Sequence, residues 1–221
     1  MDGAPRWRVD PAQDHPDNPF GMDEDCRNCP NLCDARTSVV HGYGDVGADF
    51  LFVGGRPGSG ADRTGIPFTG DDAGCRLQRI LGDLELSNSP PDADRPELDG
   101  AYCTYLTRCR HPDRDPTDEE ITTCDPYLTA DLRMINPEII VPVGTLALRG
   151  VAVEHTTRNP EELDADDLHA TTIRGRGFEL VPMRALEDQT DEETEAFVEY
   201  FAESVLGRDY RQTKGRSGAH D

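Results

Sequence analysis

The stretch ADFLFVGGRPGSGADRTGIPFTGDDAG, residues 48–74, decides the fold class of this chain. Its first part, Ala48 to Val53, is a short apolar run that ends in glycines, as many buried parallel strands do. The remainder, Gly54 to Gly74, holds seven glycines and two prolines, a composition that predicts a loop and no helix. An amphipathic helix is expected to follow, from Cys75 to Leu84. This order of strand, loop and helix is typical of α/β proteins.

The rest of the chain repeats the alternation of strands and helices. Strands are expected at residues 101–107, 138–143 and 178–183, and helices at 118–136, 145–150 and 191–206. The acidic stretch 154–168 is interpreted as a surface excursion. The pattern predicts an α/β sandwich with a mostly parallel sheet. In such folds ligands bind at the carboxyl ends of strands, so the glycine-rich loop after Val53 is the first candidate site.

The length and composition predict one domain with polar ends. We expect a polar leader at 1–25, a single domain at 26–206 and a disordered tail at 207–221. The sequence contains no apolar run of membrane-spanning length and no signal peptide, which predicts a cytoplasmic protein that does not bind membranes.

The net charge is extreme for a folded protein. The chain has 44 acidic and 22 basic residues, a net charge of −22, and by itself such a charge predicts repulsion of nucleic acid at low salt. The acidic residues are scattered along the whole chain, which favours a halophilic protein in a salt-rich cytoplasm. Under that interpretation the charge excludes no class of partner.

Four of the seven cysteines have the spacing of metal ligands. Cys26 and Cys29 form a C-x2-C pair in a polar segment, and Cys109 and Cys124 follow much later. Thiolates select zinc or an iron-sulfur cluster, and the residue types do not separate the two. The alternative is that these are ordinary buried cysteines. We interpret the other three as core residues or bystanders, with Cys33 as a possible competing ligand: Cys33, Cys75 and Cys103.

The motifs together resemble the iron-sulfur (family 4) uracil-DNA glycosylase superfamily, with this chain as a divergent, haloarchaeal-type member. The resemblance rests on CRNCP, on the order of Asp62, Gly65, Pro67, Phe68, Gly70 and Gly74 in the glycine-rich stretch, and on TRCRHPDRDPTDEEITTC followed by INPEIIVPVG. It runs from about Cys26 to Gly150 and more weakly to the end.

The resemblance implies a fold, a cofactor and a reaction. The fold is a three-layer α/β/α sandwich with a four-stranded, mostly parallel central sheet. The cofactor is a [4Fe-4S] cluster, with zinc as the runner-up, on Cys26, Cys29, Cys109 and Cys124. The reaction is excision of uracil, or a related damaged base, from DNA by a monomer that flips the base into a pocket. The residues implied to bind the substrate are Gly55, Arg56, Pro57, Gly58, Phe68, Tyr105 and Arg184.

Three departures from the family pattern bear on activity. Gly55 replaces a glutamate, Tyr105 replaces an asparagine that reads the uracil edge, and MRALEDQ, residues 183–189, replaces an H-P-S loop, with Arg184 near the histidine position. Asp62 is then the best candidate for a catalytic carboxylate, ahead of Asp71 and Asp72. His111 and His155 are the imidazole candidates. Three functions stay open: an active glycosylase, an inactive paralogue that binds damaged or single-stranded DNA, and a structural paralogue with another partner.

Overall fold

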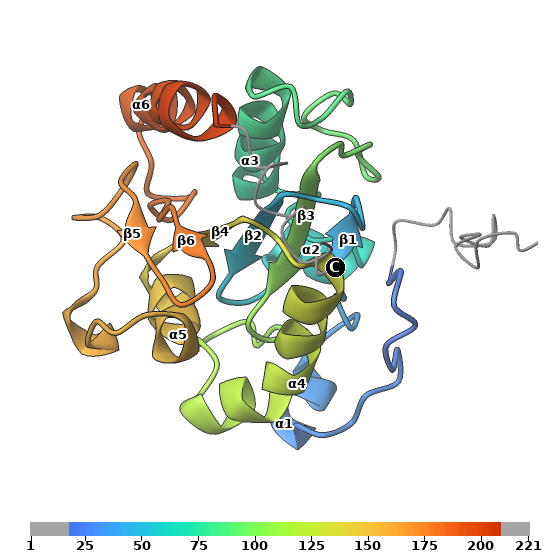
Figure 1. Cartoon of the computed structure of the whole chain (residues 1–221). Coiled ribbons are helices and arrows are strands. Elements are labelled where there is room, and N and C mark those ends of the chain that lie inside the picture. Colours follow the sequence, from blue (N-terminus) through green and yellow to red (C-terminus); the bar gives the residue numbers. More distant parts are fainter. Residues whose placement is uncertain (1–17, 209–221) are drawn as a thin grey trace, which may run out of the picture.

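The computed structural model describes residues 18–208, so most of the expected leader and tail lie outside the described residues. One mixed sheet runs through the molecule in the strand order β1-β3-β2-β4-β6-β5 (Figure 1). Its four inner strands are parallel: β3 (Ala101–Tyr105), β2 (Phe50–Gly54), β4 (Ile139–Val143) and β6 (Glu179–Leu180). The antiparallel edges are β1 (Tyr43–Gly44) and β5 (Ile173–Arg174). The sequence predicted four strands and missed the two at the edges, β1 and β5, because they are too short to show a periodic pattern.

Helices cover both faces of this sheet, which confirms the three-layer α/β/α prediction. Helices α3 (Asp72–Asp83) and α6 (Asp191–Phe201) lie on one face, and α4 (Asp118–Ile135) and α5 (Thr145–His155) lie on the other (Figure 1). Successive strand side chains point to opposite faces. In β2, Phe52 joins the core under α3 and α6, whereas its neighbours along the strand join the core under α4 and α5.

The sequence predicted a loop over the whole glycine-rich stretch, and this prediction is wrong in part. The stretch contains a short helix, α2 (Ser59–Thr64), which ends at Gly65 in the left-handed conformation, with φ of +78°. Gly60 allows this helix to pack on the chain that follows it, because a Cβ at this position would lie 2.2 Å from the Thr69 carbonyl oxygen. Gly60 therefore allows close packing of a short helix that the glycine and proline content of this stretch had not predicted.

Helix α4 begins at a capping box and carries Cys124 into the interior. The Thr117 hydroxyl accepts from the Glu120 backbone N–H, and the Glu120 carboxylate accepts from the Thr117 N–H. The Arg114 guanidinium donates to the same carboxylate at 2.7 and 2.8 Å and holds the pKa of Glu120 down at about 2. The helix ends at Ile135. The next residue, Asn136, adopts the left-handed conformation, and Pro137 follows it.

The carboxyl-terminal part departs from prediction at its boundaries. The expected strand at 178–183 narrows to β6, although the Met183 N–H still donates to the Pro142 carbonyl oxygen at 2.9 Å. The acidic stretch 154–168 is not only a surface excursion, because it contains a short 3-10 helix (Pro160–Glu162) and buries Leu163 and Ala165 in the core. A short π-helical turn, Ala202–Leu206, continues α6. Within residues 18–208, no helix has the length and apolar character to cross a membrane.

Candidate active site and cysteine centre

The carboxyl ends of three parallel strands meet at one edge of the sheet. Gly54, the last residue of β2, is in register with Tyr105 of β3 and Val143 of β4. A cavity of about 410 Å³ opens at this edge. It is lined by Gly54, Gly55, Arg56, Gly58, Phe68, Asp71, Ala73, Gly74, Tyr105, Asp115, Val143, Gly144, Thr145, Leu146, Ala185, Leu186 and Glu187. This is the position where open α/β sheets bind ligands.

The glycine-rich loop forms one wall of this cavity. Of the four loop residues predicted to bind the substrate, Gly55, Arg56 and Gly58 line it, and buried Pro57 does not. Arg56 Nε pairs with the exposed Asp115 carboxylate at 2.9 Å, so its charge is partly neutralised at the rim. Because Gly55 and Gly58 have no side chains, their backbone amides are the polar groups of this wall beside the Arg56 guanidinium.

Phe68 and Tyr105 form a packed aromatic pair within the cavity wall. Their ring centroids lie 4.7 Å apart with planes at 35°, and the Phe68 backbone N–H donates to the Tyr105 hydroxyl oxygen at 2.9 Å. Gly54 makes room for both rings, because a Cβ there would lie 2.6 Å from Tyr105 Cδ1. Only 7% of Phe68 and 3% of Tyr105 are exposed. Burial also raises the pKa of the Tyr105 hydroxyl, so this group stays neutral. The tyrosine ring therefore covers much of Phe68.

Asp62, the predicted catalytic carboxylate, lies outside the residues that line the cavity. It is buried, and its carboxylate accepts from the backbone N–H groups of Thr37, at 2.9 Å, and Ser38, at 3.3 Å. Among the carboxylates that line the cavity, Asp71 accepts from the Gly60 and Gly74 N–H groups at 2.8 and 2.9 Å. Both side chains are thus occupied in holding backbone segments.

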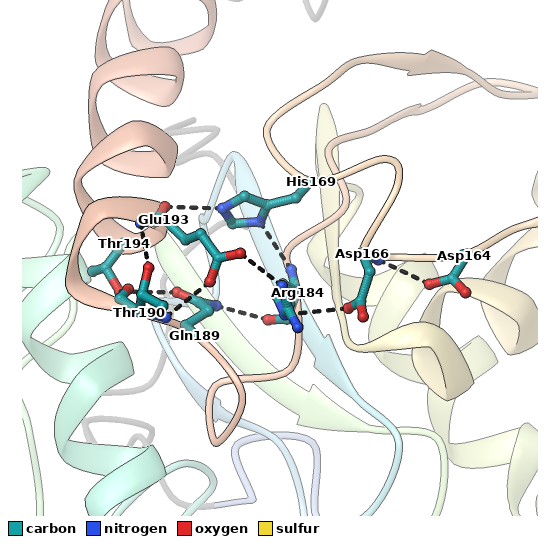
Figure 2. A network of polar contacts seen from close by, with 8 residues as sticks. All are labelled: Asp164, Asp166, His169, Arg184, Gln189, Thr190, Glu193 and Thr194. Atoms are coloured by element: carbon teal, nitrogen blue, oxygen red, sulfur yellow. Dashed lines mark hydrogen bonds and ion pairs between the residues drawn. The ribbon is translucent and has the colours of Figure 1, made fainter.

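Arg184 also lies outside the cavity lining, but the three residues that follow it, Ala185 to Glu187, are part of that lining. Figure 2 shows Arg184 inside a polar network with His169, Asp166 and residues at the start of α6. Leu186, which belongs to the segment that replaces the H-P-S loop, is 3% exposed and packs in the core.

His169 was not among the predicted imidazole candidates, which were His111 and His155. His111 accepts from the Asp113 N–H and His155 packs on Phe178, and neither lines the cavity. No motif surrounds His169 in the sequence. Its partners, Arg184 and Glu193, lie 15 and 24 residues away, so only the fold brings them together.

The four predicted cysteine ligands converge from three segments. Cys26 and Cys29 precede α1 (Pro30–Ala35), Cys109 follows β3, and Cys124 lies in α4. All four line one small cavity, which Cys33 does not line. Among residues 18–208, however, no three side chains of Cys, His, Asp or Glu stand close enough together to hold a metal ion. The four cysteines therefore line the same cavity, but their side chains are not arranged as the ligands of a metal ion.

The surroundings of the sulfurs suit thiolate ligands. Arg36 Nη1 donates to Cys109 Sγ at 2.9 Å, and the Arg108 backbone N–H donates to Cys124 Sγ at 3.3 Å. Burial raises the pKa of the Cys124 thiol to about 11, so a metal ion or cluster is needed to hold this residue as a thiolate. Hydrogen bonds to sulfur are a common feature of iron-sulfur sites. The donor set therefore fits a thiolate-bound centre.

A buried ion pair lies between the cysteines and the cavity wall. Arg108 Nη2 bonds Asp131 Oδ2 at 2.6 Å, and Arg108 Nη1 donates to the Tyr105 carbonyl oxygen at 2.7 Å and to the Thr104 hydroxyl. Only 1% of the Arg108 side chain and 0% of the Asp131 side chain are exposed. Because the Arg108 amide also touches Cys124, this one residue connects the cysteine centre to β3.

The match with known proteins decides the family. A family model described as the uracil DNA glycosylase superfamily matches residues 41–204. The chain belongs to this superfamily. Its matched region includes the strand-end cavity and two of the four cysteines, whereas Cys26 and Cys29 precede it.

Curated relatives in the uracil DNA glycosylase superfamily carry two type names. A Type-4 uracil-DNA glycosylase of Archaeoglobus fulgidus is 37% identical over 159 residues, which are 70% of this chain and 68% of the relative. One of Sulfurisphaera tokodaii, also Type-4, is 38% identical over 120 residues, 54% of this chain and 50% of the relative. A Type-5 enzyme of Thermus thermophilus is 35% identical over 147 residues, 57% of this chain and 67% of the relative. The match thus spans between half and two thirds of these relatives' length.

Proposed function

We propose that this protein is a DNA N-glycosylase of base-excision repair, which hydrolyses the N-glycosidic bond of uracil or a related damaged base in DNA. The observation that carries the proposal is the cavity at the carboxyl ends of β2, β3 and β4, walled by the Gly54–Gly58 loop and Phe68. The names of the curated relatives support it.

The geometry gives these groups distinct tasks. A base inside a duplex is unreachable, so the nucleotide must be flipped out before it enters the cavity. Phe68 is the aromatic surface for the base, and the backbone amides between Gly55 and Gly58 are the groups suited to stabilise negative charge on the departing base. We assign positioning roles to Asp62 and Arg184, since each bonds neighbouring segments outside the cavity.

The second candidate is an inactive paralogue that binds damaged or single-stranded DNA. The observation that favours it is the Tyr105 ring on Phe68, because the surface expected to stack a base is already covered. A tyrosine hydroxyl also does not offer the paired donor and acceptor of an amide.

Base release from oligonucleotides separates the two candidates. We expect the unchanged protein, at molar salt, to release uracil, hypoxanthine or xanthine from single-stranded DNA slowly but measurably, as alkali-labile abasic sites. A Phe68→Ala variant is the control: where the base displaces the Tyr105 ring and stacks on Phe68, this variant should be at least about tenfold slower, because base stacking contributes roughly 1–3 kcal/mol. Retained binding of the lesion strand with no release of any of the three bases would make the inactive paralogue the correct reading.

We further propose a [4Fe-4S] cluster on Cys26, Cys29, Cys109 and Cys124, with zinc as the alternative. The shared cavity and the Arg36 and Arg108 hydrogen bonds support this ligand set. When bound, the cluster would tie α1, β3 and α4 together and order the loops that join them.

Metal content of two cysteine variants tests this ligand set. After anaerobic purification we expect about four iron atoms per chain and a broad brown absorbance, as a cluster of this type requires. Cys124→Ser should lose most of this iron, and Cys33→Ser, whose thiol lies outside the shared cavity, should keep it. A colourless protein with one zinc ion would reject the cluster, and equal loss in both variants would reject the ligand assignment.

The setting of the protein is proposed from composition and fold. We propose a cytoplasmic, halophilic protein that meets DNA as a monomer, since a net charge of −22 needs high salt to be screened on approach to phosphates. The proposed organisation keeps a leader at 1–25, one domain at 26–206 and a tail at 207–221. Phe20, within the proposed leader, already packs on Tyr102 at a centroid distance of 5.9 Å.

A further inference from the structure

The loop after β6 forms one wall of the cavity, and besides the buried Leu186 side chain it is held by polar contacts at its two ends. Ala185, Leu186 and Glu187 line the cavity, and the residues at both ends of this segment are held by side chains from elsewhere (Figure 2). At its far end, Gln189 Nε2 donates back to the Arg184 carbonyl oxygen at 2.7 Å. At its near end, the contact is made by the Arg184 backbone N–H.

The Arg184 backbone N–H donates to an imidazole nitrogen. His169 Nδ1 lies 3.0 Å from this amide nitrogen, and His169 Nε2 lies 2.9 Å from the Glu193 carbonyl oxygen of α6. A backbone N–H only donates and a carbonyl only accepts, so the ring must be neutral, with its proton on Nε2. His169 therefore bridges the cavity loop and α6 through one defined tautomer.

The side chains around the imidazole support the same bridge. Arg184 Nη1 pairs with Glu193 Oε1 at 2.6 Å, and Arg184 Nε lies 3.4 Å from Asp166 Oδ1. Phe197 packs against the ring at a centroid distance of 5.6 Å. These are the charged and aromatic groups that face His169 from the loop, from α6 and from its own segment. None of them accepts a hydrogen bond from the Arg184 amide, which leaves Nδ1 as its one acceptor among the described contacts.

We propose that His169 is a positioning residue of the candidate active site, whose neutral imidazole fixes the Arg184 amide and thereby the cavity wall from Ala185 to Glu187. Protonation of Nδ1 would turn its acceptor into a donor and release the amide. The activity consequence rests on the proposed glycosylase function, whereas the structural bridge does not.

Two isosteric variants separate the two ring nitrogens. Asn places an oxygen acceptor near the position of Nδ1, and Gln places a nitrogen donor near the position of Nε2. Hydrogen exchange of the Arg184 amide, corrected for its intrinsic pH dependence, is the primary measurement. We expect exchange to be about tenfold faster in His169→Ala and His169→Gln, and near that of the unchanged protein in His169→Asn. His111→Ala is the matched control and should leave it unchanged.

Exchange in His169→Asn as fast as in His169→Gln would overturn the proposal, and this pair still decides if His169→Ala does not fold. In base-release assays His169→Ala should lose about tenfold in kcat/KM. No base release by any variant, with the exchange pattern intact, would reject the glycosylase function and leave the bridge standing.

Discussion

The Tyr105→Asn variant is expected to release uracil from DNA about a hundredfold faster than the unchanged protein, because hydrogen bonds to a substrate edge dominate such discrimination. The change removes the ring that lies 4.7 Å from Phe68 and uncovers a surface for the base. It also supplies an amide, which offers a donor and an acceptor together at the end of β3. Single-turnover rates on uracil-containing and matched thymine-containing strands measure the effect.

Two matched variants distinguish the effect of a larger cavity from the effect of the amide hydrogen bonds at position 105. Tyr105→Leu opens the cavity without an amide and should gain little, and Tyr105→Phe keeps the ring while removing the acceptor of the Phe68 N–H. If Tyr105→Asn is no faster than Tyr105→Leu, the amide does not read the base. Adding Gly55→Glu should help only if Leu146 moves, since a Cβ at Gly55 would lie 2.8 Å from Leu146 Cδ2.

The largest loss of stability is expected from breaking the buried ion pair. Asp131→Leu leaves the Arg108 guanidinium buried without its carboxylate partner and should lower the free energy of unfolding by about 3–5 kcal/mol. Chemical denaturation at a fixed molar salt concentration measures this change. Iron content is recorded on the same samples, because the Arg108 amide contacts Cys124.

A double variant provides the control for the ion pair. Asp131→Leu combined with Arg108→Met removes both charges and should recover most of the lost stability, since a well-packed apolar pair is often as stable as a buried ion pair. If the double variant is as unstable as Asp131→Leu, the loss comes from packing and the charge argument is wrong. Thr104→Val removes a hydroxyl that donates to Asp131 and accepts from Arg108, and it should cost about 1–3 kcal/mol while both charges stay paired.

The central strands and the cysteine convergence were predictable from the sequence for physical reasons. Buried parallel strands are apolar on both faces, so runs such as Phe50–Val53 and Ile139–Val143 stand out from their polar surroundings. The cysteines were recognised through their spacing and resemblance to a family, because soft ligands in a C-x2-C pair have few other uses. The edge strands lacked any such pattern.

Only those residues of the candidate site that lie within one sequence motif could be predicted. The Gly55–Gly58 loop follows β2 directly, and Phe68 comes just after α2 in the same glycine-rich stretch, so one continuous segment supplies both. Asp62 was the preferred catalytic carboxylate in the sequence, whereas its bonds to the Thr37 and Ser38 amides, which come from a distant segment, were not visible there. The cavity wall at Ala185–Glu187 and its histidine support depend on tertiary contacts that no local pattern encodes.

The convergence of the cysteines also has a topological consequence. A cluster that joins Cys29 to Cys109 would close a chain loop that contains β2, the glycine-rich segment and β3, and such cross-links restrict the unfolded chain more than the folded one. One wall of the cavity, from Gly54 to Tyr105, lies inside this closed loop, and the other, from Val143 to Glu187, lies outside it. Loss of the cluster would therefore act mainly on the unfolded state: it would return conformational freedom to the segment that carries the first wall, and the folded state would become less stable.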